Sequence, residues 1–187
     1  LDAKSAKAPG AVYTKSGDIR ETLETFGFKI ADKPEDAALA VVSHKEYKED
    51  PRLQAMKDVV VYSLDANGEI DGKKISTKMV RHFTTFVVSP DVPGLWGMGT
   101  ANFTKIMEAG GFCKAVNPPT LPSINIPDSK IAAAGKKASM HYDIFDDDNF
   151  NPVIRYYEVD GRRRWVTGFD DTWNPVAAVA LNVAKDK

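Results

Sequence analysis

The pattern of hydrophobic and polar positions is clearest near the start of the chain, where apolar side chains recur at helical spacing. Ile19, Leu23 and Phe26 fall on one face of a helix, and the polar residues between them face water. Asp18 predicts the cap that begins this helix, and Gly27 predicts the left-handed residue that ends it. We therefore expect a short amphipathic helix whose apolar stripe, including Phe26, is buried.

Runs of apolar and β-branched residues on both sides of this helix predict strands. The runs cover residues 11–13, 28–30, 37–42, 59–62, 73–75 and 79–88. A polar turn at 65–68 separates two of them, as in neighbouring strands of a hairpin. This order predicts a meander of strands.

The last third of the chain predicts a hairpin and then a helix. The pair Asp160-Gly161 is a strong two-residue turn signal between the alternating stretches 152–158 and 163–169. Thr172 or Asn174 then predicts the cap of a helix whose apolar face is rich in valine. The C-terminal region is thus expected to close the sheet and cover it.

A further helix is expected over residues 101–109, inside a segment that echoes the first helix. Residues 102–118 repeat the order of residues 18–34, an amphipathic helix, a Gly-Phe pair and a short strand. We expect an α+β fold in which an antiparallel or mixed sheet carries helices packed on one face. The pattern also allows two repeated helix–strand units.

The predicted organisation has four parts. They are a flexible leader at 1–10, a first α+β unit at 11–116, a proline-rich strap at 117–128, and a C-terminal hairpin and helix at 129–187 packed on the same core. The strap contains four prolines, which exclude a helix or a central strand and favour a linker or an extended segment.

Composition narrows the classes of function. The 187 residues include 25 basic and 26 acidic side chains, so the net charge of −1 gives no field that would attract nucleic acid. The single cysteine excludes an internal disulfide and a multi-cysteine zinc site. No apolar stretch reaches the roughly 20 residues of a membrane-spanning helix. The small, polar leader resembles the stretch left after a signal is processed, although a trimmed chain would look the same.

The loop at 95–99 is the most suggestive candidate for a contact site. Leu95, Trp96 and Met98 lie among glycines, so the loop can present a large apolar surface to a partner or a ligand. The competing interpretation is that Trp96 covers an edge of the sheet. We take Leu95, Trp96 and Met98 as candidate partner-binding residues.

A second hypothesis places a ligand pocket between the two helix–strand units. His82, His141, Asp146 and Asp148 would line it in a small-molecule-binding protein or a hydrolase, provided that their side chains converge. The histidines show no metal-ligand spacing, so we expect no metal ion and no other cofactor.

The acidic run at 146–151 also suggests a third, weaker hypothesis, a calcium-stabilised adhesive module. Its oxygen ligands are closely spaced, and Glu158 falls where a distal bidentate ligand belongs. Pro152, however, occupies the position where the sharp turn of a calcium loop needs glycine. A solvated turn is therefore the favoured interpretation.

Two other features receive structural interpretations. Cys113 lies in a predicted strand, and no local signature supplies a base that would make it a nucleophile. The arginines at 162–164 could bind a phosphate or a carboxylate, but strand alternation divides them between two faces. We expect them to mark an edge strand that discourages strand addition.

The segment from Asp18 to Val42 resembles the opening βαβ unit of small bacterial envelope lipoproteins and secretion-system accessory proteins. The resemblance lies in the helix, the Gly-Phe strand, the Pro-Glu-Asp-Ala turn at 34–37 and the apolar strand that follows. It implies a periplasmic or outer-membrane-associated protein that scaffolds or binds an envelope partner, with no catalytic residues to carry over. No lipobox cysteine is present in the sequence, so we expect any membrane association to depend on an anchor other than a lipid on this segment. The leading hypothesis is a non-enzymatic envelope protein of a secretion, conjugation or surface-assembly machine.

Overall fold

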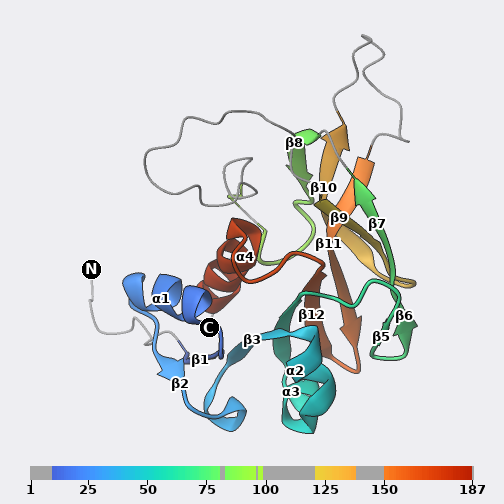
Figure 1. The fold of residues 1–187 in the computed structure, drawn as a ribbon. Helices are drawn as coiled ribbons and strands as arrows, with labels where there is room; N and C mark the ends of the chain where they lie inside the picture. Colours follow the sequence, from blue (N-terminus) through green and yellow to red (C-terminus); the bar gives the residue numbers. More distant parts are fainter. Residues whose placement is uncertain (1–9, 81–82, 96, 99–120, 138–149, 187) are drawn as a thin grey trace.

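The computed structural model describes residues 10–80, 83–95, 97–98, 121–137 and 150–186, and Figure 1 shows its fold. Its centre is a mixed sheet of eight strands in the order β2-β1-β3-β4-β12-β11-β10-β8. In chain order these strands are β1 (Val12–Tyr13), β2 (Ile30–Ala31), β3 (Leu39–Ser43), β4 (Asp58–Tyr62), β8 (Phe83–Val88), β10 (Lys130–Lys137), β11 (Phe150–Val159) and β12 (Arg162–Thr167). The mixed sheet and its helices confirm the predicted α+β class.

One half of the sheet is parallel. β1 pairs with both β2 and β3, β3 pairs with β4, and β4 pairs with β12, all in the parallel sense. Parallel neighbours need a crossover, and α1 (Gly17–Thr25) joins β1 to β2, while α2 (His44–Glu49) and α3 (Pro51–Ala55) join β3 to β4. The expected meander is therefore wrong in this half, because β4 pairs with a strand from the end of the chain.

The other half of the sheet is antiparallel, through the pairs β12–β11, β11–β10 and β10–β8. The β11–β12 hairpin turns at Asp160 and Gly161, whose φ angles of 50° and 74° confirm the predicted turn. A second hairpin, β5 (Glu69–Ile70) and β6 (Lys73–Lys74), turns at Asp71 and Gly72 with φ of 49° and 76°. The predicted turn at 65–68 forms, with the Gly68 N–H donating to the Asp65 carbonyl at 3.2 Å, but it does not join the two strands of a hairpin.

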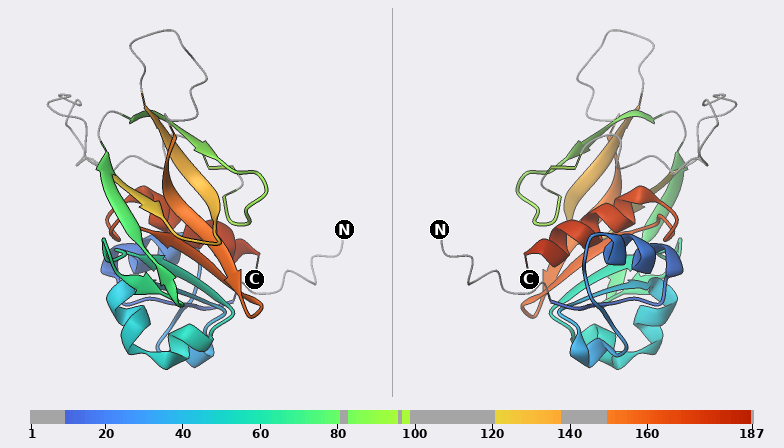
Figure 2. Two further views of the ribbon diagram at one scale, coloured as in Figure 1. Left: turned by 90° about the vertical axis from the view of Figure 1, so that its right-hand side faces the viewer. Right: turned by 90° about the vertical axis from the view of Figure 1, so that its left-hand side faces the viewer.

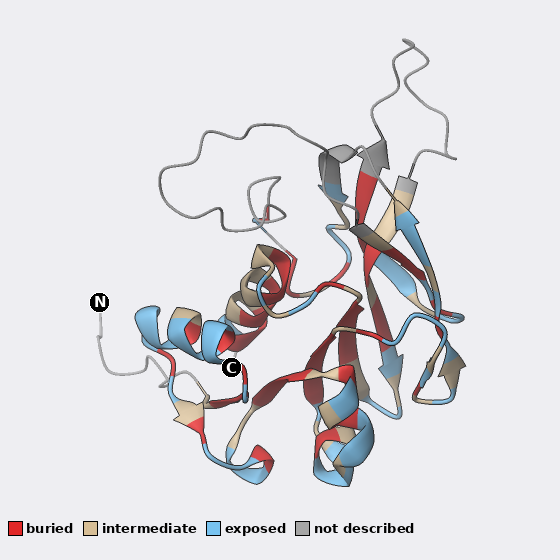
Figure 3. Cartoon of the chain, viewed as in Figure 1, coloured by how far each residue is buried: buried red, intermediate tan, exposed pale blue. Residues whose placement is uncertain are grey.

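Helices cover both faces of the sheet (Figures 1 and 2). Helix α1 and the C-terminal helix α4 (Asn174–Lys185) bury their apolar stripes on one face. The other face is covered by α2 and α3, and by a separate two-stranded sheet of β7 (Ser76–Val80) and β9 (Leu121–Asn125). The expectation of helices on one face is corrected, because Tyr47 of α2 and Leu53 of α3 belong to the second buried cluster. Figure 3 shows the buried strands enclosed between these layers.

The two ends of α1 differ from the prediction. The Ser16 side chain accepts the backbone N–H of Ile19 at 3.1 Å and caps the helix, so Asp18 lies in the first turn. The helix ends before Phe26, whose side chain is 61 % exposed, and the chain turns at Gly27 with φ of 82°. The spacing of apolar residues predicts a helix that includes Phe26, but the helix ends at Thr25. Phe26 therefore lies outside the buried stripe.

The cap of α4 and the proline-rich strap also differ in detail from expectation. Trp173 occupies the N-cap position of α4 and its side chain makes no capping hydrogen bond, so neither Thr172 nor Asn174 is the cap. The strap contains β9, in which Pro122 lies opposite Met79 of β7. A proline fits here because β9 is a strand of the small sheet and not of the central one. None of the described helices has the length and apolar character of a membrane span.

Candidate functional site

The predicted partner loop contributes to the core. Leu95 is fully buried and Met98 is 8 % exposed, and both belong to the cluster that holds the apolar face of α4. This corrects the expectation that these two side chains present an apolar surface. Trp96 lies outside the described residues, so its partner role stays a prediction.

The alternative ligand residues also lie outside the described part of the chain. These are His82, His141, Asp146 and Asp148. Cys113 and the repeat at 102–118 lie outside it too, and so does most of the acidic run at 146–151. Glu158, the suggested distal calcium ligand, lies on β11, where its carboxylate accepts the Tyr156 hydroxyl at 2.6 Å.

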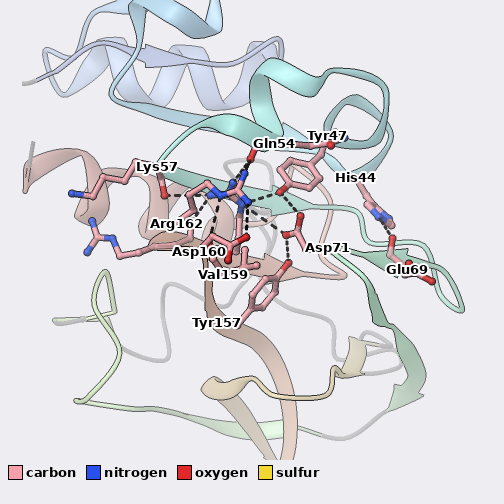
Figure 4. Close-up of polar contacts among 12 residues, drawn as sticks. His44, Tyr47, Gln54, Lys57, Glu69, Asp71, Tyr157, Val159, Asp160 and Arg162 are labelled. Atoms are coloured by element: carbon pink, nitrogen blue, oxygen red, sulfur yellow. Dashed lines mark hydrogen bonds and ion pairs between the residues drawn. The ribbon is translucent and has the colours of Figure 1, made fainter.

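A connected group of polar side chains lies between α2, the β5–β6 turn, β11 and β12 (Figure 4). We call Tyr47, Asp71, Tyr157 and Arg164 the tyrosine–aspartate cluster. Tyr47 and Tyr157 each donate a hydroxyl hydrogen to one oxygen of Asp71, at 2.8 and 2.7 Å. The Arg164 Nε donates to the Tyr47 hydroxyl at 2.9 Å and lies 3.9 Å from Asp71 Oδ2. One carboxylate thus joins a helix, a turn and two strands.

The rest of the Arg164 guanidinium is bound by backbone. Its Nη2 donates to the carbonyl of Gln54 at 2.9 Å, and its Nη1 donates to the carbonyls of Lys57 and Arg163 at 3.2 and 2.9 Å. Arg164 is fully buried, and its strand β12 lies between β4 and β11 in the sheet. The expectation that residues 162–164 mark an edge strand is therefore wrong.

The electrostatics of the cluster favour a structural role. Burial raises the pKa of Tyr47 to about 12 and raises that of Tyr157 further, so both hydroxyls stay protonated at neutral pH. A protonated tyrosine can donate to the Asp71 carboxylate, and the carboxylate accepts on both oxygens. Because these atoms are bound to one another, the cluster offers no free base or nucleophile.

His44 is the buried histidine of the described structure, and it too is fully bound. Its Nδ1 accepts the backbone N–H of Asp65 at 3.0 Å, and its Nε2 faces the Glu69 carbonyl at 3.0 Å (Figure 4). These partners require a proton on Nε2 and a neutral ring. The described residues contain no group of three His, Cys, Asp or Glu side chains placed to hold a metal ion.

A hollow of about 530 Å³ lies between α1 and the start of α4, and we call it the α1–α4 groove. Ile19, Phe26, Trp173 and Ala177 supply its apolar lining. Trp173 is half-buried and packs on the core residue Phe169, with ring centroids 5.2 Å apart. Phe26 is different, since most of its ring is exposed to solvent. The groove thus has one fixed aromatic wall and one accessible aromatic wall.

The charged part of the groove lining is acidic. Asp18, Glu21 and Asp171 line it, and within the described residues no lysine, arginine or histidine does so. None of these three carboxylates is in an ion pair with another described residue. Asp18 lies in the first turn of α1, where the helix dipole stabilises negative charge, and Asp171 lies three residues before the start of α4.

A second hollow, of about 380 Å³, lies beside the carboxyl ends of β1 and β3. The strand order reverses between these two strands, which is where α/β sheets often bind ligands. Its lining includes Arg52, but this guanidinium donates to Asp50 and Glu35 at 2.8 and 3.1 Å. The charge of Arg52 is therefore already neutralised by these two carboxylates.

Comparisons with protein-family models, with curated proteins and with solved structures found no match. Function is therefore inferred from the residues of this chain. Sequence reasoning missed the α1–α4 groove because the spacing of Phe26 fits the buried stripe of its helix. The available signal was Gly27, which follows Phe26 directly and places it at the end of the helix.

Proposed function

We propose that this protein is a non-enzymatic binding or scaffolding protein that holds a protein partner in the α1–α4 groove. The observation that carries the proposal is the exposure of Phe26, at 61 %, beside a hollow whose other aromatic wall is Trp173. Large exposed aromatic side chains next to a hollow are typical of binding hot spots. A partner that buries Phe26 would remove its ring from water, and this burial of apolar surface would favour binding.

The polar chemistry of the described residues supports binding over catalysis. The tyrosine–aspartate cluster and His44 use their donors and acceptors within the fold. The setting that we propose, an extracytoplasmic envelope assembly, is the one that the resemblance of residues 18–42 implies. Secretion, conjugation and surface assembly are the machines in which such a protein would act.

Affinity capture from native cell envelopes tests this proposal, with the tagged wild-type protein and a Phe26→Ser variant. Met79→Ser is the matched control, because Met79 is 58 % exposed on β7, on the opposite side of the sheet. We expect one stoichiometric protein that is lost with Phe26→Ser and kept with Met79→Ser, and that binds the purified wild-type chain. Equal capture by both variants, or no stoichiometric protein, would reject the groove as the binding site.

A further inference from the structure

We infer that the α1–α4 groove recognises a cationic peptide segment of its partner, in which a large apolar side chain is flanked by lysine or arginine. This inference rests on the proposed function and adds the chemistry of the partner. It is carried by three properties of the groove lining, namely its charge, its hydrogen-bonding groups and its aromatic walls.

The charge of the lining has one sign. Asp18, Glu21 and Asp171 contribute three carboxylates to a hollow that no described basic side chain lines. The whole chain has a net charge of only −1, so this is a local asymmetry and not the result of an acidic protein. Complementary potentials increase the rate of association and select partners, so a basic segment is favoured here over an acidic one.

The threonine hydroxyls of the lining already donate within the fold. Thr22 and Thr25 donate their hydroxyl hydrogens to the carbonyls of Asp18 and Glu21, four residues earlier, at 3.0 and 2.8 Å. The Thr172 hydroxyl donates to Asp170. The groove therefore presents carboxylates whose natural partners are side chains that only donate, and lysine and arginine are such side chains.

The aromatic walls fit the same kind of segment. A large apolar side chain can pack between the exposed Phe26 ring and Trp173, which Phe169 holds in place. A neighbouring guanidinium or ammonium can lie over the Phe26 ring, because the face of an aromatic ring attracts cations. An aromatic or aliphatic anchor with basic neighbours thus satisfies the apolar walls and the acidic rim together.

Selection from a random displayed 12-residue peptide library tests this inference without assuming the sequence of the partner. The wild-type protein is the target, and Phe26→Ser is the counter-selection target. Enriched peptides are then synthesised and titrated by fluorescence anisotropy at low and high salt. The titrations compare three proteins. They are the wild type, a groove triple variant (Asp18→Asn, Glu21→Gln and Asp171→Asn) and a charge-matched control triple variant (Glu24→Gln, Asp32→Asn and Asp36→Asn). All three control carboxylates are exposed and lie outside the groove lining.

We expect enriched peptides that combine an aromatic or large aliphatic residue with at least two lysine or arginine residues. The groove triple variant should bind these peptides about tenfold more weakly, because it loses three partly exposed charge pairs. The control triple variant should change the affinity less than about twofold. High salt should weaken wild-type binding and leave the groove triple little changed. Thermal unfolding of each variant by circular dichroism shows that the comparison is made on folded protein.

The two possible failures can be told apart. Peptides that depend on Phe26 but lack basic residues, or that bind the groove triple as tightly as the wild type, would overturn the cationic partner and leave the groove as a binding site. A selection that enriches no peptide over the Phe26→Ser counter-selection would overturn both the inference and the proposed function.

Discussion

Arg163 of β12 and Asp58 of β4 are joined by two parallel hydrogen bonds across a parallel strand pair. The Arg163 Nε and Nη2 donate to the two carboxylate oxygens of Asp58 at 2.7 and 2.8 Å. Asp58 is fully buried, and the Arg163 side chain is 26 % exposed and covers one face of Trp165. This bidentate pair fixes the register at which β4, from the first third of the chain, meets the C-terminal hairpin.

We therefore predict that Asp58→Asn destabilises the fold more than the loss of any exposed ion pair. The substitution removes one strong acceptor and leaves the Arg163 guanidinium without its charge partner, at a cost of about 2 kcal/mol. Urea unfolding measures the effect as a lower midpoint with an unchanged m-value. Arg52→Ala, which breaks the exposed pairs with Asp50 and Glu35, is the control and should change the midpoint much less. Equal effects of the two variants would contradict a structural role for the Arg163–Asp58 pair.

The tyrosine–aspartate cluster predicts energetic coupling between two tyrosines that approach the same carboxylate from different elements. Tyr47→Phe and Tyr157→Phe each remove one donor to Asp71 and should each cost about 1 kcal/mol. The double variant leaves the carboxylate with neither donor, so its cost should exceed the sum by about 0.5 kcal/mol or more. A double-mutant cycle from urea unfolding gives this coupling. Strict additivity would show that the two hydroxyls act independently and that Asp71 does not link them.

Local signals in the sequence predict much of the fold. The Asp160-Gly161 turn, the strand at 59–62 and the C-terminal helix all follow from residues close to one another in the chain. The pairing of β4 with β12 does not, because it joins residues about a hundred positions apart, with β5 to β11 between them in the chain. The same long-range pairing places β12 inside the sheet, whereas the arginines at 162–164 predicted an edge strand.

The candidate site is less predictable from the sequence than the fold. Leu95 lies among glycines, as in an exposed loop, but its side chain packs into the core because the loop crosses the end of α4. Phe26 has the spacing of a core residue but is exposed, because its helix ends one residue earlier. In both cases the burial of the side chain depends on the backbone path at the end of a helix or in a loop. Sequence patterns locate the ends of elements least well.

Gly94 should be intolerant of any side chain, unlike Gly97 in the same loop. Both have a positive φ, of 83° and 78°. A Cβ on Gly94 would lie 2.6 Å from Val183 Cγ2 of α4 and 3.2 Å from Trp165 Nε1, whereas a Cβ on Gly97 would meet nothing within 4 Å. Gly97→Ala should cost about 1 kcal/mol from backbone conformation alone, and Gly94→Ala about 2–4 kcal/mol because overpacking is added. Thermal unfolding of the two variants separates these effects. Similar losses would mean that the loop can move away from α4.

His44 should make the stability of the protein depend on pH near neutrality. Burial lowers the pKa of His44 below its ordinary value of 6.5, although the Asp65 carboxylate lies 3.4 Å from Nδ1 and opposes this shift. The unfolded chain therefore binds a proton at His44 at a pH where the folded chain does not. The free energy of unfolding is thus highest above about pH 6.5 and falls as the pH decreases from there toward the lowered pKa.

Urea unfolding at pH 7.5 and pH 5.5 tests the sign of this dependence. Both pH values lie above 3.8, the ordinary pKa of an aspartate. The hydrogen bond from Lys48 lowers the pKa of Asp65 further, so this carboxylate stays ionised at both pH values. We expect the wild type to lose stability at pH 5.5, and a His44→Asn variant to be less stable at pH 7.5 but to show a smaller loss between the two values. Asn can accept the Asp65 N–H as Nδ1 does, and it carries no titrating group. A wild type that gains stability at pH 5.5, or a variant with the same loss, would contradict a buried neutral His44.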